Sequence, residues 1–138
     1  MSAFQHIAMN CIDRLAQERF YTDVFGFRRA RVFQADTPNE FVMLRLGSLC
    51  LEFFNAPDGQ AAPSPGEQPV GFKHLAFDVP DIEATVAKLQ SMGLDTGPVV
   101  DCSDQVPGLR VCFLKDPEGN ILELMEGWHD DPALSAEG

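Results

Sequence analysis

A chain of 138 residues, 45% of them hydrophobic, can form one compact core or two half-size modules, and it is too short for a large multidomain enzyme. Ten Lys and Arg against 21 Asp and Glu give a formal net charge of −11, which argues against nucleic acid and anionic membrane surfaces as partners. The sequence shows neither a signal peptide nor an apolar stretch of about 18 residues that would span a membrane. We therefore expect a cytoplasmic protein.

The chain contains an internal repeat. The segment that starts HIAMNCIDR at His6 parallels the segment that starts HLAFDVPDI at His74, and Asp13 matches Asp81. Each copy opens with a short alternating apolar run, which predicts a strand, and continues with an aspartate suited to a helix N-cap. The repeat therefore predicts the same strand and helix twice.

An amphipathic stretch follows each aspartate and ends at a glycine, Gly26 or Gly93, which is typical of a helix end. The apolar residues recur at helical spacing, so each predicted helix has one face suited to packing on a sheet. The expected buried positions are Ala16, Phe20 and Val24 in the first helix and Ile82, Val86 and Leu89 in the second.

Three further strand-like runs follow each helix, with tight turns expected at residues 47–48 and 116–120. The predicted strands cover residues 28–34, 40–46 and 49–55 in the first copy, and 96–101, 109–115 and 121–125 in the second. The fold class is therefore α+β, with two βαβββ modules at residues 1–56 and 71–128 in one structural domain. We interpret residues 57–70 as a linker rich in proline and glycine, and residues 129–138 as a flexible tail.

Strand alternation places one histidine and one glutamate of each module on the face away from its helix. In the first strand the apolar side chains at Ile7, Met9 and Cys11 alternate with His6, and the same parity applies to His74. In the last strand of each module, leucines that face the helix alternate with Glu52 or Glu123. The inward set predicted from this parity is His6, Glu52, His74 and Glu123.

These four side chains together predict a site for one divalent metal. Two carboxylates that face each other among apolar residues repel and are costly to bury, and a cation removes both problems. Two imidazole nitrogens and two carboxylate oxygens suit Ni, Zn, Co, Fe or Mn, and six-coordination would leave positions open for substrate oxygens. A single strand histidine is usually structural, and we interpret His129 in that way because it has no counterpart in the repeat.

Several segments carry a family resemblance: HIAMN, FYTDVFGF, LEF, GFKHLAFDV and DPEGNILEL. Together they resemble the vicinal oxygen chelate superfamily, which comprises glyoxalases, bleomycin resistance proteins and dioxygenases. The resemblance implies that the paired modules form an open eight-stranded barrel around the metal, commonly in a homodimer. Its ligand set is nearest to that of glyoxalase I, lactoylglutathione lyase. If this chain catalyses the same reaction, its Glu123 or Glu52 would move a proton through an enediolate of a methylglyoxal-thiol hemithioacetal.

The chain departs from glyoxalase I at Asn10, where that enzyme typically has an arginine that grips the carboxylate of its thiol substrate. Asn10 and Phe54, which share the inward face, are the candidate substrate-binding residues. The cluster Arg28, Arg29 and Arg31 is open to two interpretations, an anion site or a solvated edge strand.

Three alternatives within the superfamily remain open. An extradiol-type dioxygenase would need only three of the four ligands, with iron. An acyl-CoA epimerase usually carries glutamine at the position of Glu52. A drug-binding resistance module would use the same fold without catalysis and without metal.

Overall fold

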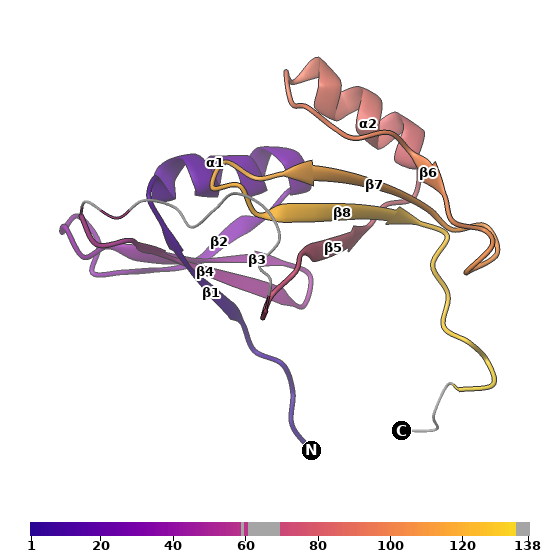
Figure 1. The fold of residues 1–138 in the computed structure, drawn as a ribbon. Coiled ribbons are helices and arrows are strands. Elements are labelled where there is room, and N and C mark those ends of the chain that lie inside the picture. The colour runs from indigo at the N-terminus through magenta and orange to yellow at the C-terminus, as the bar shows by residue number, and fades with distance from the viewer. Residues whose placement is uncertain (59, 61–69, 135–138) are drawn as a thin grey trace. The chain divides into compact units, whose positions relative to one another are not determined.

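The computed structural model describes residues 1–58, 60 and 70–134 (Figure 1). In these residues two helices and eight strands follow the order β-α-β-β-β twice. The first set is β1 (Ile7–Cys11), α1 (Arg14–Phe25), β2 (Arg28–Phe33), β3 (Phe41–Leu46) and β4 (Leu49–Asn55). The second set is β5 (Leu75–Asp78), α2 (Ile82–Ser91), β6 (Val100–Asp101), β7 (Arg110–Lys115) and β8 (Ile121–Glu126).

The described residues form two compact units. The first lies within Met1–Pro65 and also includes Asp116–Gly119, and the second lies within Gly66–Lys115 and Asn120–Gly138. Each unit contains one mixed four-stranded sheet, ordered β1-β4-β3-β2 in the first and β5-β8-β7-β6 in the second. In both sheets the first and last strands of the module pair in parallel, and the other pairs are antiparallel. The two predicted βαβββ modules are therefore confirmed.

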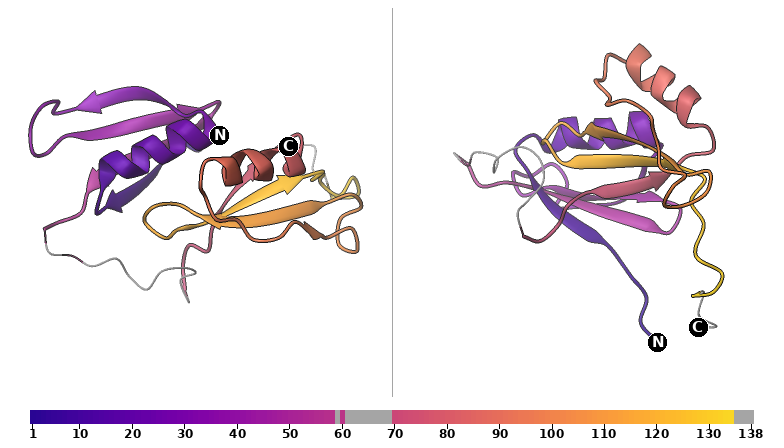
Figure 2. Two further views of the ribbon diagram at one scale, coloured as in Figure 1. Left: turned by 90° about the horizontal axis from the view of Figure 1, so that it is seen from above. Right: turned by 45° about the vertical axis from the view of Figure 1, so that its right-hand side comes forward.

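Each helix begins at the predicted aspartate. Asp13 accepts a hydrogen bond from the Ala16 amide at 3.0 Å, and Asp81 accepts one from the Ala84 amide at 3.0 Å. Gly26 ends α1 with a φ of 80°, a left-handed conformation that only glycine adopts without strain. The views in Figures 1 and 2 show each helix lying along one face of the sheet of its own unit.

The buried face of α1 differs from the predicted one. Phe20 is buried as expected, but its buried neighbours are Gln17 and Tyr21, both fully enclosed, while Ala16 and Val24 are partly exposed. The face is rotated because Tyr21 packs its ring against Phe27 and Phe53, and because Gln17 has a buried partner. In α2 the expected residues Ile82 and Leu89 are buried, and Val86 is partly exposed.

That buried partner is Asp116, in the turn between β7 and β8. Its Oδ2 accepts hydrogen bonds from Gln17 Nε2 at 2.7 Å and from the Tyr21 hydroxyl at 2.8 Å. Burial, together with the charge of Asp116, raises the pKa of Tyr21 far above its usual range. The predicted turn therefore also anchors α1, and this explains why Asp116–Gly119 belong to the first unit.

One predicted strand is much shorter in the structure. Of residues 96–101 only Val100–Asp101 form β6, and Thr96 makes a single bridge to Leu114. Pro98 lies between them and has no amide hydrogen to donate to a ladder, so the strand cannot continue. Most of the predicted linker and the last four residues of the predicted tail lie outside the described residues.

Within the described part of the chain, neither helix is long and apolar enough to cross a membrane.

Candidate metal centre

The first His–Glu pair lies where β1 meets β4. Parallel pairing sets Ala8 opposite Glu52, and His6 precedes Ala8 by two residues, so its side chain reaches the same face. His6 Nε2 lies 3.4 Å from Glu52 Oε1. The Glu52 side chain is 11% exposed and the His6 side chain 36%, so the carboxylate is enclosed while the imidazole can be reached from outside.

The face that carries this pair is the one away from α1. The Phe53 ring contacts Tyr21 of α1, with 5.5 Å between ring centroids. Because successive strand side chains alternate, the neighbouring Glu52 points to the other face, as strand parity predicted.

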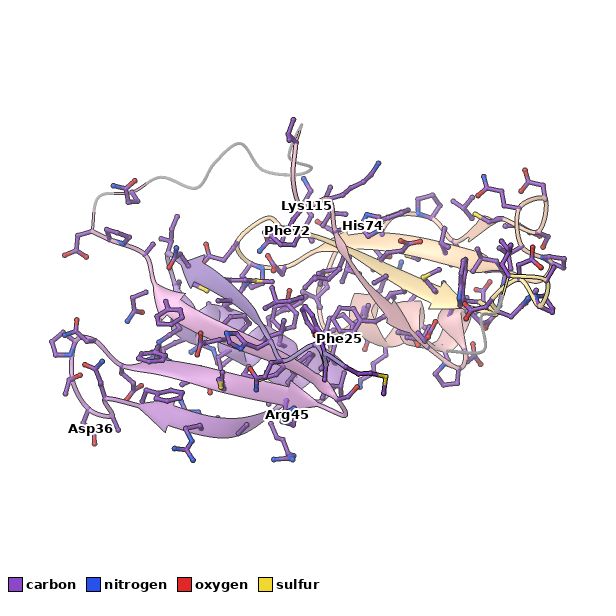
Figure 3. The ribbon with its side chains drawn as sticks, turned by 90° about the horizontal axis from the view of Figure 1, so that it is seen from below. Phe25, Asp36, Arg45, Phe72, His74 and Lys115 are labelled. Carbon is purple, nitrogen blue, oxygen red and sulfur yellow. The ribbon has the colours of Figure 1, made fainter. Side chains whose placement is uncertain are left out.

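The second unit repeats the arrangement. β5 pairs in parallel with β8, so that Ala76 lies opposite Glu123. His74 precedes Ala76 by two residues, at the N-terminal end of β5 (Figure 3). His74 Nε2 lies 2.8 Å from Glu123 Oε2, and the side chains are 26% and 13% exposed. The edge of the His74 ring also meets Phe113, 5.8 Å away.

Each unit thus presents an imidazole nitrogen and a carboxylate oxygen at the same register, and both atoms are of types that bind divalent transition metals. The carboxylates have no protein cation within 4 Å apart from these imidazoles, in the part of the chain that the structure describes. This donor chemistry fits half a metal site per unit. Within either unit, the described residues include no group of three or more His, Cys, Asp or Glu side chains that could hold a metal. The joint four-ligand site therefore stays a prediction.

The two candidate substrate-binding residues are cross-strand partners. Asn10 in β1 lies opposite Phe54 in β4, on the face that carries Glu52. The Phe54 ring stacks on Phe41, with 4.4 Å between centroids and 20° between planes, and Phe41 stacks in turn on Phe33 at 4.5 Å. A hollow of about 240 Å³ adjoins this aromatic row and is lined by Gln34, Pro38, Asn39, Glu40, Phe41, Phe54 and Asn55.

The predicted arginine cluster is divided between two faces of the first sheet. Arg29 donates two hydrogen bonds to Glu18 of α1, one of them from Nη2 at 3.2 Å. It therefore lies on the helix side and does not face the His6–Glu52 pair. Arg28 and Arg29 alternate as in any strand, and a β-bulge between Arg29 and Arg31, which the sequence did not reveal, puts Arg31 on the face of Arg28.

Comparison with known proteins places the chain in a family. A family model for the Glyoxalase/Bleomycin resistance protein/Dioxygenase superfamily matches residues 3–124. The chain therefore belongs to this superfamily, and the resemblance seen in the sequence is confirmed at that level.

Two curated bacterial relatives match almost the whole chain. The uncharacterized protein YaeR of Escherichia coli (strain K12) is 36% identical over 124 residues, which cover 88% of this chain and 93% of YaeR. The uncharacterized protein YwkD of Bacillus subtilis (strain 168) is 30% identical over 128 residues, 91% of this chain and 98% of YwkD.

Solved structures agree on the fold. A glyoxalase family protein from Enterococcus faecalis is 34% identical, with a TM-score of 0.72 over 90% of this chain and 97% of that protein. FosX from Listeria monocytogenes, a fosfomycin resistance protein in complex with Mn(II) and sulfate, is 14% identical. Its TM-score is 0.67, and the match covers 93% of this chain and 94% of FosX. TnmS3 from Streptomyces, an antibiotic binding protein, is 19% identical. Its TM-score is 0.68, and the match covers 93% of this chain and 98% of TnmS3. The last two show likeness of fold alone.

Proposed function

We propose that this protein is a divalent-metal-dependent lyase or isomerase of the glyoxalase type, acting by enediolate formation on a small substrate with adjacent oxygens. A methylglyoxal-thiol hemithioacetal is the model substrate. The observation that carries the proposal is the His–Glu pair that recurs at equivalent register in both units. The proposal includes a homodimer located in the cytoplasm. Light scattering of the purified protein checks the dimer.

Four residues would hold the metal: His6, Glu52, His74 and Glu123. Their atom types suit Ni, Zn, Co, Fe or Mn, and the Mn(II) bound in FosX supports a divalent ion in this fold. When bound, such an ion supplies Lewis-acid stabilisation of negative charge on the substrate oxygens.

The carboxylates would carry the proton. Glu123 or Glu52 takes a proton from one substrate carbon and returns it to the neighbouring carbon, so the reaction is an isomerisation with no net gain or loss of atoms. Both carboxylates are almost enclosed, and their cross-strand neighbours are apolar: Met43 opposite Glu52 and Phe113 opposite Glu123. The low exposure of both carboxylates limits the access of water to the base.

Metal content tests the proposal first. Inductively coupled plasma mass spectrometry of the purified protein is expected to find about one metal per chain, lost in His74→Ala and Glu123→Ala and kept in His129→Ala. The control histidine lies outside both pairs, with a ring nitrogen 3.4 Å from the Asp130 carbonyl. Metal loss in Glu123→Gln with unchanged turnover would contradict the proposal.

A non-catalytic binding module is the second candidate, and the partly exposed row of stacked rings at Phe33, Phe41 and Phe54 favours it because it offers an apolar surface. The antibiotic-binding TnmS3 has the same fold. A protein that holds no metal as purified and takes none on reconstitution would establish this candidate over the enzyme. Oxygen uptake with catechols would instead point to the dioxygenase alternative.

A further inference from the structure

We infer that Arg28, Arg31 and Arg45 form an oxyanion-binding site on the sheet face that carries His6 and Glu52. Its ligand is a carboxylate or phosphate group of the substrate. The anion site itself follows from the first unit alone, and its assignment to the substrate rests on the proposed function.

The strand register places these arginines. Arg28 of β2 lies opposite Arg45 of β3, and Arg45 lies opposite Cys50 of β4. Directly opposed residues share a face, and Cys50 shares its face with Glu52 two residues later. Arg28 and Arg45 therefore stand on the same face as the His6–Glu52 pair. Figure 3, which views the first unit from the side away from α1, labels Arg45 on β3.

The β-bulge brings Arg31 to the same face. Residues 28 and 31 of a regular strand would point to opposite faces, but the register shifts between Arg29, opposite Leu44, and Arg31, opposite Met43. The extra residue reverses the alternation. Arg29 contacts Glu18 on the helix side. Because of the bulge, Arg31 lies on the opposite face, with Met43 and its cross-strand partner Glu52.

The three arginines have no ion-pair partner among the described residues. Arg14, Arg29 and Arg110, by contrast, each contact a carboxylate within 4 Å. Arg28 and Arg45 lie directly opposite on neighbouring strands, where like charges are destabilising. The chain has 21 acidic residues, yet none of the described ones forms an ion pair with these arginines. An anionic ligand would offset this repulsion.

The arginines also match an oxyanion in shape and position. A guanidinium is a planar fork of donors that binds carboxylate or phosphate oxygens in pairs. The guanidinium carbon of Arg31 lies 5.9 Å from the centroid of the Phe33 ring. β3 is separated from β1 by β4 only, so the Arg45 backbone lies about 10 Å from that of β1, two strand spacings away. A small substrate could therefore reach both the arginines and His6.

Nuclear magnetic resonance titration of the metal-free protein tests the inference. The full chain, in low salt with a chelator, is titrated with inorganic phosphate and separately with sodium acetate. Amide shifts are expected in β2 and β3, and Arg45→Gln is expected to weaken binding tenfold or more. Arg19→Gln removes the same charge from an exposed position on α1 and is expected to weaken binding less than twofold. Arg45→Lys keeps the charge without the fork and is expected to give an intermediate loss.

The outcomes divide clearly. Binding of phosphate alone assigns a phosphoryl group, binding of acetate alone assigns a carboxylate, and binding of neither overturns the inference. Equal weakening in the Arg45 and Arg19 variants also overturns it, because the effect would then be one of net charge. The chelator makes this result independent of the metal, and Arg45→Gln is expected to keep the wild-type metal content, so failure of the anion site and failure of the metal site are separate results.

Discussion

Asp116 shows how much depends on one buried acceptor. Its carboxylate satisfies Gln17 and Tyr21, and its Oδ1 also accepts from the Glu118 amide at 3.0 Å. Asp116→Ala leaves two buried donors without an acceptor, so we expect the free energy of unfolding to fall by about 2–4 kcal/mol. Asp116→Asn keeps one oxygen and is expected to lose less. Urea unfolding followed by circular dichroism measures this, and Asp95→Ala, at an exposed position, is the control. Equal losses at the two aspartates would mean that the buried network contributes nothing.

The four cysteines differ in the environment of their thiols. Burial, as the largest cause, raises the pKa of Cys11 to about 12, whereas Cys102 is partly exposed. Only the thiolate reacts with iodoacetamide, and a pKa near 12 leaves about one thiolate in ten thousand at pH 8. We expect peptide mass spectrometry to find Cys102 alkylated first in the folded protein and Cys11 only after unfolding in urea. Early modification of Cys11 would contradict its burial.

At the scale of elements, the end of β8 depends on a close backbone approach. Gly127 has a φ of 85°, and a Cβ there would lie 2.5 Å from the Gly108 carbonyl oxygen. We expect Gly127→Ala to cost about 2–5 kcal/mol, from backbone strain and overpacking together. Gly93→Ala is a matched control, because Gly93 has a φ of 81° and open space around its Cβ position. The thermal midpoint should fall further for Gly127→Ala than for Gly93→Ala. Equal falls would mean that the contact with Gly108 adds nothing to the cost of the backbone strain.

Glu126 joins three elements of the second unit. It accepts hydrogen bonds from Arg110 Nε in β7 at 2.9 Å and from the Ile82 amide at the start of α2 at 3.0 Å. The Arg110 hydrogen bond, followed by that of Ile82, lowers the pKa of Glu126 below its usual value. A carboxyl with a lowered folded pKa stabilises the fold fully above its unfolded pKa of about 4.5, and this contribution is lost as the pH falls through the folded value.

The prediction that follows concerns pH. Glu126→Gln is expected to be less stable than wild type at pH 7, and the difference should shrink as the pH is lowered below about 4. Urea midpoints measured across this range give the answer. If wild type and Glu126→Gln differ in stability by the same amount at every pH, the ionised carboxylate is not what stabilises the contacts of Glu126 with Arg110 and Ile82.

For the whole molecule, the features predicted correctly from sequence are those with local causes. The caps at Asp13 and Asp81 and the period of two in each strand act within a few residues, so they can be seen without the fold. The repeat then checks each prediction against its second copy. The same logic gave the face of Glu52 correctly, because its neighbour Phe53 contacts Tyr21 of α1.

The features that the sequence did not reveal depend on contacts between distant segments. The buried face of α1 is set by Asp116, almost a hundred residues away, and no helical periodicity reports on that. A β-bulge shifts strand parity by one residue without any mark in composition, which is why Arg29 and Arg31 could not be assigned to different faces. Arg45 belongs to the proposed anion site because it pairs with Arg28, and that pairing can be seen only from the strand register.

The proposed metal site draws equally on both units, and this makes stability a test of whether one ion serves all four ligands. A ligand that binds only the folded state stabilises it by about 2.7 kcal/mol at a hundred times its dissociation constant, so chelation should lower the thermal midpoint. If the ion is shared, His6→Ala and His74→Ala each abolish the gain on adding metal, and the double variant loses no more than either one. If each pair binds its own ion, each single variant keeps half of the metal and the losses add. Calorimetry with and without metal, together with metal content per chain and His129→Ala as control, distinguishes the two cases.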